Sequence, residues 1–297
     1  MTVVISPMPN TFAGEASAID CAKPFDGRDI NAIHEGMAKH AVLVFHDQPL
    51  TDEEQLAFTK RFGDIERYET PGHIRKRGEE RLGSGVADFS NLTQNGSLMT
   101  PDDRIWLFKL GDRLWHSDSS FRPITAGYSL LSGRTIPARG GETEFADMRA
   151  AYDALDDETK AEIEDLVCEH SLIYSREAIG FFDLTPEERN HFQPVRHRLV
   201  RVDARTGRKS LFLSAHAGAI VGWTIPEARM FLRDLTEHAT QPQFVYRHRW
   251  RTGDLVVWDN RTTMHRARRF RPGEIRDVRR TTLAGDATET TGDLARV

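Results

Sequence analysis

FVYRHRWRTGDLVVWDNRTTMH, residues 244–265, is the stretch that decides the fold. From Phe244 to Trp250 the residues alternate between two faces, which is the period of a β-strand. Thr252-Gly253-Asp254 supplies a turn, and Leu255 to Trp258 is a short apolar run typical of a buried strand. The stretch therefore predicts a β-hairpin that leads toward His265.

Helices are expected around this strand-rich region. Apolar residues recur at helical spacing in 28–40 and 226–239, and Thr51 to Glu54 has the pattern of a capping box. Further helices are expected from Met148 to Leu155 and through Ile163, Leu166 and Val167, whereas 41–45 is predicted to be a buried strand. We therefore predict a mainly β fold with flanking helices, built on an antiparallel double sheet of which a jelly roll is one form.

One domain is expected to span residues 1–297. Residues 66–113 are rich in Gly, Asn, Asp and Arg and show little periodicity, so this segment is predicted to be an excursion or lid over the active face. The polar tail, residues 286–297, is predicted to be frayed.

The composition excludes several classes of partner. The net charge of −5 gives no reason to expect nucleic acid or an anionic membrane. No apolar run is long enough to span a bilayer, and no export signal is evident. Two cysteines without CxxC spacing indicate neither a disulfide framework nor a thiolate zinc site, so a cytoplasmic protein is expected.

The segment LWHSDSSF, residues 114–121, places His116 two residues before Asp118. In an extended chain such residues face the same way, so the pair could offer one nitrogen and one oxygen to a single metal ion. His265 is the candidate for a third ligand. Two imidazoles and one carboxylate leave coordination positions free, as non-haem Fe(II) oxygenases require, but a hydrogen-bonded surface pair or a metallohydrolase site would have the same spacing.

The arginines that follow His265 favour an anion pocket. In the segment IRDVRRTTL, residues 275–283, strand alternation puts Arg276 and Arg280 on one face and Arg279 on the other. The two Cα atoms on the shared face would lie roughly 13 Å apart, a spacing that suits two different carboxylates. An exposed basic surface is the plainer interpretation.

Three segments together resemble the taurine dioxygenase family of Fe(II)/2-oxoglutarate-dependent dioxygenases. They are WHSDSSF (115–121), GGETEFADMRAAY (140–152) and the stretch from Trp258-Asp259-Asn260 to His265-Arg266. The similarity extends from the strand at 42–45 to residues 279–282, and within the family it is greatest to the members that cleave aryloxyacetates.

The resemblance implies a double-stranded β-helix, or jelly roll, with helices outside it. It further implies that His116, Asp118 and His265 bind Fe(II), and that Thr143 and Arg276 hold the distal carboxylate of 2-oxoglutarate. Arg280 matches the position that meets the substrate carboxylate. His216 matches a histidine near the substrate pocket, although a buried core histidine would fit equally well.

The implied reaction consumes O2 and 2-oxoglutarate and hydroxylates the carbon next to the ether oxygen of an aryloxyalkanoate such as 2,4-dichlorophenoxyacetate. Succinate, CO2, a phenol and glyoxylate (or the corresponding 2-oxo acid) are the products. The resemblance favours a homo-oligomer with a small carboxylate as substrate.

The sequence departs from the family pattern at Asn95-Gly96-Ser97, where relatives carry a lysine after an Asp-Gly pair. A hydroxylase of a sulfonate or another small carboxylate, a zinc hydrolase and a non-catalytic binding protein are the alternatives.

Overall fold

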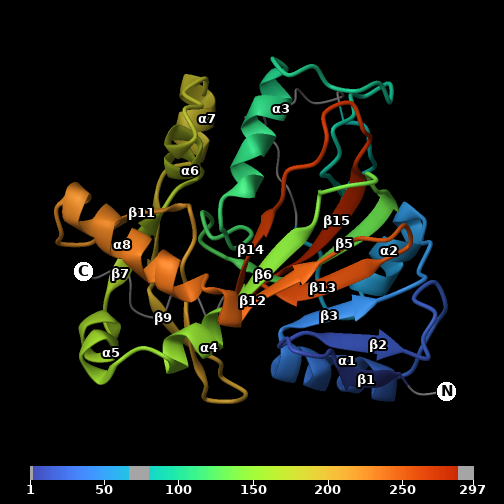
Figure 1. Cartoon of the computed structure of the whole chain (residues 1–297), viewed down its shortest axis with the longest axis horizontal. Helices are drawn as coiled ribbons and strands as arrows, with labels where there is room; N and C mark the ends of the chain where they lie inside the picture. Colours follow the sequence, from blue (N-terminus) through green and yellow to red (C-terminus); the bar gives the residue numbers. More distant parts are fainter. Residues whose placement is uncertain (1–2, 67–79, 287–297) are drawn as a thin grey trace.

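The computed structural model describes residues 3–66 and 80–286 (Figure 1). Its strands are β1 (Val4–Pro7), β2 (Gly14–Ser17), β3 (Val42–Phe45), β4 (Ala87–Asp88), β5 (Ala126–Thr135), β6 (Thr143–Asp147), β7 (Val167–His170), β8 (Val195–Arg198), β9 (Val200–Val202), β10 (Lys209–Leu211), β11 (Ala217–Ile220), β12 (Val245–His248), β13 (Leu255–Asp259), β14 (Thr263–Ala267) and β15 (Asp277–Ala284). Its helices are α1 (Gly27–His40), α2 (Asp52–Thr59), α3 (Arg104–Lys109), α4 (Met148–Asp153), α5 (Asp157–Ile163), α6 (Leu172–Ala178), α7 (Pro186–His191) and α8 (Ile225–Ala239), with 3-10 turns η1 (Leu110–Arg113) and η2 (Pro242–Phe244).

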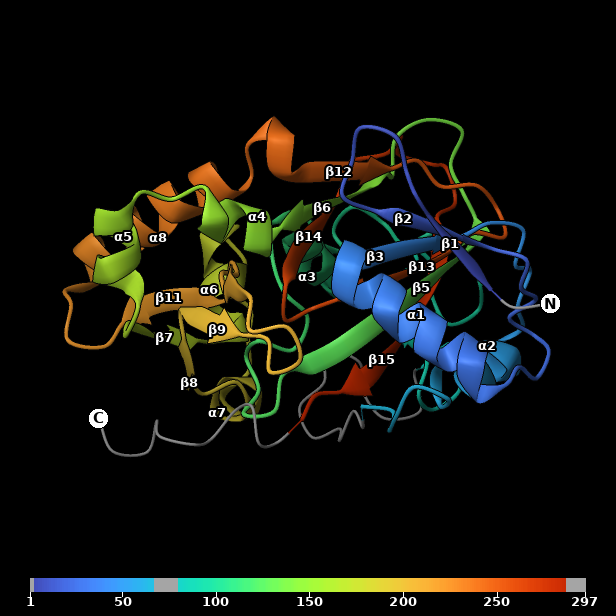
Figure 2. The same ribbon diagram turned by 90° about the horizontal axis from the view of Figure 1, so that it is seen from below.

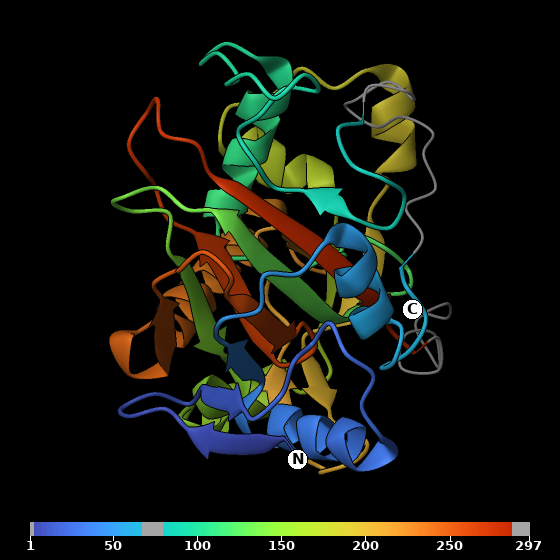
Figure 3. The ribbon, with the colours of Figure 1, turned by 90° about the vertical axis from the view of Figure 1, so that its right-hand side faces the viewer.

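A large sheet forms one half of the molecule. Within the described residues it has the strand order β1-β2-β3-β13-β5-β15-β4, and its neighbours run antiparallel except for the parallel pair β2 and β3. The two longest strands, β5 and β15, pair along most of their length and run together across the sheet (Figure 3).

A smaller sheet, β12-β6-β14, lies against the large one. Phe145 of β6 packs on Trp258 of β13 with ring centroids 5.4 Å apart, and Tyr246 of β12 lies in the same apolar cluster. Two antiparallel sheets that share one buried cluster form the core of a jelly roll. The prediction of a mainly β fold with flanking helices is confirmed.

Strand β3 of the large sheet is buried on both faces. Val42 and Val44 point into the cluster between the sheets, whereas Leu43 and Phe45 point to the other side. There they pack with α1 and α2, which cover the outer face of the sheet (Figure 2). Burial on both faces explains why the run of residues 42–45 is continuously apolar rather than alternating.

The predicted hairpin in residues 244–258 is wrong, although both of its strands exist. β12 pairs with β6, whereas β13 pairs with β3 and β5, so the two strands belong to different sheets. The turn between them carries the chain from the small sheet to the large one. Asp254 holds this crossing in place because it lies 3.0 Å from His248 at the end of β12 and 2.6 Å from His46 after β3.

Other expectations have mixed outcomes. Helices α1 and α8 match the predicted ones closely, and the capping box at Thr51 is present at the start of α2. The helix predicted through Ile163 to Val167 is wrong, because α5 ends at Ile163 and Val167 opens β7.

Of the predicted lid, residues 67–79 lie outside the described residues, as does the tail from residue 287. Within the described ranges, no helix combines the length and apolar content that a membrane crossing requires.

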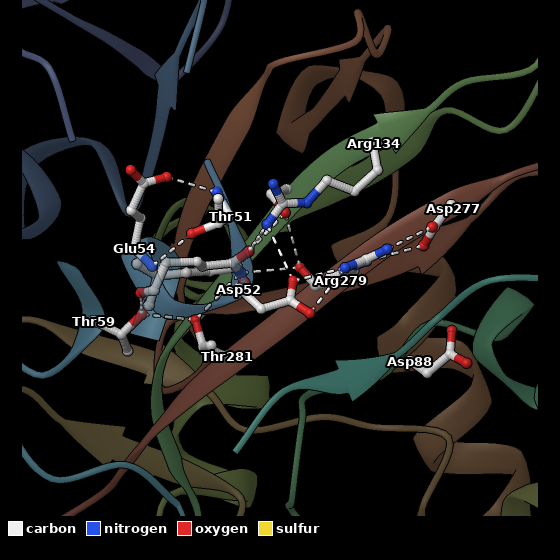
Figure 4. Close-up of polar contacts among 12 residues, drawn as sticks. Thr51, Asp52, Glu54, Thr59, Asp88, Arg134, Asp277, Arg279 and Thr281 are labelled. Carbon is white, nitrogen blue, oxygen red and sulfur yellow. Dashed lines mark hydrogen bonds and ion pairs between the residues drawn. The ribbon is translucent and has the colours of Figure 1, made fainter. Parts of the chain in front are cut away.

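Strand β15 has two functionally different faces. On its outer face Arg279 pairs with Asp52 of α2 at 2.8 Å and with Asp277 at 3.0 Å (Figure 4). Arg81, which precedes β4, also pairs with Asp277 at 2.8 Å. These ion pairs join α2 and the segment around residue 81 to β15, and thereby hold the strand whose inner face carries Arg280.

Gln55 of α2 is a fully buried member of this polar network, with 0% of its surface exposed. Its amide nitrogen donates to the carbonyl oxygens of Leu130 and Arg279, at 3.1 and 3.0 Å. Its amide oxygen accepts a hydrogen bond of 2.7 Å from the Ser132 hydroxyl. Replacing this side chain would leave buried polar groups on two strands without partners.

We therefore expect Gln55→Ala to lower the free energy of unfolding by about 2–4 kcal/mol, through lost hydrogen bonds and a cavity. Urea denaturation of the full chain measures this change. The exposed Gln243→Ala is the control and should change stability by less than about 0.5 kcal/mol. Equal stability of the two variants would contradict the structural role of Gln55.

Candidate metal centre and active site

Backbone hydrogen bonds bring His116 and His265 together. The His116 N–H donates to the His265 carbonyl at 3.0 Å, and the His265 N–H donates to the His116 carbonyl at 2.8 Å. This antiparallel bridge places the two side chains on the same face, and their ring centroids lie 4.2 Å apart. Both residues are buried.

The hydrogen bond of His116 fixes which ring nitrogen faces the site. Nδ1 lies 2.8 Å from the Leu114 carbonyl, which can only accept, so Nδ1 carries the hydrogen. In the neutral ring the lone pair is therefore on Nε2. That nitrogen lies 3.9 Å from Oδ1 of Asp118 and is free to bind a metal ion.

Asp118 occupies a turn rather than an extended strand. The segment is extended only as far as Ser117, and the turn that begins at Asp118 continues through Ser119, whose φ is +54°. The expectation that strand alternation aligns Asp118 with His116 is therefore wrong in its cause. The two side chains nevertheless converge, because Asn260 accepts a hydrogen bond of 3.1 Å from the Asp118 N–H and fixes the turn.

His116, Asp118 and His265 offer ligand atoms that all lie within 4.8 Å of one another. Oδ1 of Asp118 is 3.8 Å from Nε2 of His265. Two imidazoles and one carboxylate gathered on one side of a site are the ligand set of non-haem Fe(II) oxygenases, and the described residues contain no other such group of His, Cys, Asp and Glu.

The charges at this centre suit a divalent cation. Burial alone would raise the pKa of the Asp118 carboxyl, but Arg280 and the two histidines more than offset it, and the pKa lies below its ordinary value. Burial and the neighbouring His116 lower the pKa of His265 well below its usual range. The site thus presents an ionised carboxylate and a neutral imidazole, which are the forms that bind metals.

Arg280 lies directly against the centre. Its guanidinium donates a hydrogen bond to Oδ1 of Asp118 and stacks 4.4 Å from the ring centroid of Phe89. Because Arg280 is buried and shares the inner face of β15 with Val278, the alternation predicted for this strand is confirmed. Arg279 lies on the opposite face, in the polar network.

Arg276 is the second arginine on the inner side of this segment. It is buried, and its Nε donates to the Gly141 carbonyl at 3.2 Å. Burial lowers its pKa to about 10, and no carboxylate of the described residues lies within ion-pair distance of its guanidinium. A buried cation without a bonded anion is suited to bind the carboxylate of a small molecule.

Thr143 lies two residues after Gly141, at the start of β6. It is buried, and its hydroxyl oxygen accepts a hydrogen bond of 3.0 Å from Nε1 of Trp250. Among the described residues no hydrogen bond joins Thr143 to Arg276, so the Gly140–Thr143 segment connects them. The hydroxyl hydrogen of Thr143 remains available for another acceptor.

His216 lies beside the centre, with its ring centroid 6.0 Å from that of His116. Its Nδ1 is 2.9 Å from the Ser175 hydroxyl, which also donates to the Leu172 carbonyl at 2.9 Å and accepts from Arg176 at 3.1 Å. Since that hydroxyl has one hydrogen, Nδ1 of His216 is the donor and Nε2 carries the lone pair. His216 is both a hydrogen-bonded buried histidine and a lining residue of the cavity described below.

A cavity of about 1830 Å³ opens beside His116 and Asp118. Its walls include aromatic side chains, namely Phe89, Phe108, Phe121 and Phe192. Arg176 and Lys109 also line it, and neither was singled out by a sequence pattern. Ser97, the position of the departure from relatives, is exposed and is not among the lining residues described.

Comparison with known proteins bears on the identity of this site. The family model described as taurine catabolism dioxygenase TauD, TfdA family matches residues 5–282. The alpha-ketoglutarate-dependent 2,4-dichlorophenoxyacetate dioxygenase of Cupriavidus pinatubonensis is 42% identical over 289 residues, which cover 97% of this chain and 99% of that protein. The (S)-phenoxypropionate/alpha-ketoglutarate-dioxygenase of Sphingobium herbicidovorans is 36% identical over 295 residues, or 96% of each chain.

Among solved structures, the crystal structure of AAD-2 in complex with Mn(II) and N-oxalylglycine is similar over 98% of this chain and 100% of that one. Its TM-score is 0.94 and its sequence identity 54%. These matches agree with the motifs around His116, Gly140 and His265. The chain therefore belongs to the taurine catabolism dioxygenase TauD, TfdA family.

Proposed function

We propose that this protein is an Fe(II)- and 2-oxoglutarate-dependent dioxygenase that hydroxylates the carbon next to the ether oxygen of an aryloxyalkanoate such as 2,4-dichlorophenoxyacetate. The observation that carries this proposal is a pair of buried arginines four residues apart, Arg276 and Arg280. Arg280 contacts Asp118 of the His116, Asp118 and His265 group, whereas Arg276 has no carboxylate of the described residues within ion-pair distance. A carboxylate from each of two small molecules would bind these two guanidiniums.

In this proposal His116, Asp118 and His265 hold the iron. When bound with 2-oxoglutarate, the iron would supply the oxidising chemistry that converts the substrate, O2 and 2-oxoglutarate to the hydroxylated product, succinate and CO2. The ionised carboxylate of Asp118 and the neutral imidazole of His265 fit that metal, and no protein acid or base is required for hydrogen removal from carbon.

Arg276 holds the distal carboxylate of 2-oxoglutarate, and Thr143 donates its free hydroxyl hydrogen to the same group. The burial of Arg276 supports this role, because a desolvated guanidinium binds a carboxylate more strongly than an exposed one. Fixing the far end of the keto acid leaves its 2-oxo end in one pose toward the metal ligands.

Arg280 receives the substrate carboxylate. Its guanidinium is hydrogen-bonded to Asp118, so a carboxylate bound to Arg280 would lie next to the metal site. In an aryloxyacetate the next carbon is the methylene between the carboxylate and the ether oxygen. Hydroxylation there gives a hemiacetal, which breaks its bond to the ether oxygen and yields a phenol and glyoxylate.

The cavity suits the aromatic part of such a substrate. Phe121 and His216 lie near the metal ligands, with ring centroids 5.0 Å apart, and Phe108 and Phe192 continue the apolar wall outward. Aromatic rings pack well against such edges and faces. His216 is the proposed substrate contact closest to His116, and residues 80–89 form part of the proposed lid.

We also propose a single-domain, cytoplasmic homo-oligomer without a nucleic-acid or membrane partner. This part of the proposal is supported by the net charge of −5, the two isolated cysteines and the family resemblance.

The reaction is tested by supplying Fe(II), 2-oxoglutarate, air and 2,4-dichlorophenoxyacetate, and measuring succinate and phenol together. We expect near-equal amounts of both, and Asp118→Ala should lose more than about 99% of the activity because it removes the charged metal ligand. Asp165→Ala is the matched control, since that side chain is 92% exposed. Succinate without phenol would indicate a different acid or a sulfonate as substrate, and no succinate with any acid would refute the dioxygenase itself.

The two arginines should separate kinetically. Arg276→Gln is expected to raise the KM for 2-oxoglutarate by about 10- to 100-fold, and Arg280→Gln to raise the KM for the aryloxy acid by a similar factor, since each loses a charged hydrogen bond of about 1.5–3 kcal/mol. Steady-state kinetics with each substrate varied in turn measures this. Arg198→Gln, a half-exposed surface variant, should change neither constant. If both KM values rose equally in both variants, the assignment of one carboxylate to each arginine would be wrong.

A further inference from the structure

We propose that Ser129 and Asn260 are positioning residues that hold the Asp118 carboxylate with Oδ2 bonded to the protein and Oδ1 presented to the metal. The inference rests on the proposed metal-binding role of Asp118. Ser129 lies on β5, paired with Trp258 of β13, and Asn260 follows that strand directly. Exposure is 0% for Ser129, 1% for Asn260 and 3% for Asp118.

The orientation of the Asn260 amide is determined by its partners. Its Oδ1 lies 3.1 Å from the Asp118 N–H and 2.9 Å from Nε1–H of Trp258, and both of these groups can only donate. Its Nδ2 lies 3.0 Å from the Gly127 carbonyl, which can only accept. The flipped amide would set its NH2 group against these two N–H donors and its oxygen against the Gly127 carbonyl.

The second hydrogen of the Asn260 amide then determines the direction of the Ser129 hydroxyl. Nδ2 also lies 2.9 Å from Oγ of Ser129, so Ser129 accepts this hydrogen bond. The single hydroxyl hydrogen is left for Oδ2 of Asp118, 2.7 Å away. Thr282, whose hydroxyl is 3.5 Å from Oγ of Ser129, occupies the remaining acceptor side. The relay therefore runs from Trp258 and Asn260 through Ser129 to Asp118.

Two consequences follow for the carboxylate. Oδ2 is held by the short hydrogen bond from Ser129. Oδ1 accepts a hydrogen bond from Arg280 and is the oxygen that lies 3.9 Å from Nε2 of His116 and 3.8 Å from Nε2 of His265, so Asp118 presents Oδ1 to the metal ion. Rotation of the carboxylate would break the bond from Ser129 in a buried place where water cannot replace it, so Oδ1 stays aimed at the two histidines. Loss of a hydrogen bond to a metal ligand typically weakens metal binding by about ten- to a hundredfold.

The strand itself provides a matched control. Ser132 also lies on β5, is 1% exposed, and donates a hydrogen bond of 2.7 Å, but to Oε1 of Gln55 on the outer side. Ser129 and Ser132 are thus both buried serines of β5, but the Ser129 hydroxyl contacts Asp118 whereas the Ser132 hydroxyl contacts Gln55.

The test is titration of the metal-free full-length protein with Co(II), followed by the visible absorption of the bound ion. Ser129→Ala is expected to weaken Co(II) binding by about ten- to a hundredfold and to change the shape of the spectrum, because the carboxylate can then turn and bind through both oxygens. Ser129→Thr, which restores the hydroxyl, should recover most of the affinity. Ser132→Ala should lower the urea midpoint of the metal-free protein while keeping the wild-type Co(II) affinity and spectrum.

Wild-type Co(II) affinity and spectrum in Ser129→Ala would overturn the inference. If that variant does not fold, Asn260→Ala removes the amide that orients the same hydroxyl, and wild-type affinity there would likewise overturn it. These outcomes are distinct from failure of the proposed function. Weak Co(II) binding by Ser129→Ala, together with no succinate or phenol from the wild type, would support the relay and refute the reaction. Succinate and phenol from the wild type, together with wild-type Co(II) affinity in Ser129→Ala, would support the reaction and refute the relay.

Discussion

The reciprocal backbone hydrogen bonds between His116 and His265 are the contact on which the active site depends. They join a loop from the first half of the chain to β14 of the small sheet. This single pair of residues is enough to fix the loop, because β14 is itself paired with β6, where His265 lies opposite Phe145. Backbone geometry therefore fixes the relative position of the two imidazoles. The position of Asp118 depends on the side chains of Asn260, Ser129 and Arg280.

A related division of roles occurs along β15. The outer face of the strand carries the ion pairs of Arg279, and the Gln55 amide bonds the backbone there, whereas the inner face presents Arg280 to Asp118. Burying so many polar groups is costly unless each has a partner. The network to α2 and Arg81 supplies those partners, so the scaffold side of the strand holds the ligand-binding side in place.

Much of this arrangement could be predicted from local pattern. Caps and apolar spacing identified α1, α2 and α8, and simple alternation separated Arg279 from Arg280. The pairing of strands could not be predicted in the same way. The turn at Thr252 to Asp254 is compatible with a hairpin or with a crossing between sheets, and only the contacts of β12 with β6 and of β13 with β5 decide between them.

The site shows the same limit. His116, Asp118 and His265 have a recognisable spacing. The rule that residues i and i+2 of an extended chain face the same way does not predict the turn at Asp118. Ser129 gave no signal at all, because a small polar residue in an apolar strand has no periodicity of its own. Its partner Asn260 directly follows an apolar run, a place that fits a turn residue and a support for a ligand equally well. Contacts between residues this far apart in the sequence become visible only in the folded chain.

The two faces of β15 also limit how this enzyme can diverge. Neighbouring residues of the strand serve opposite sides, so inserting or deleting a single residue within it would exchange the two sets, turning Arg280 toward α2 and Arg279 toward the cavity. Such a change of length would damage the scaffold and the pocket in one step. Natural variation in substrate preference is therefore expected to accumulate as substitutions in the cavity walls, such as Phe108 and Phe192, while the length of β15 stays constant.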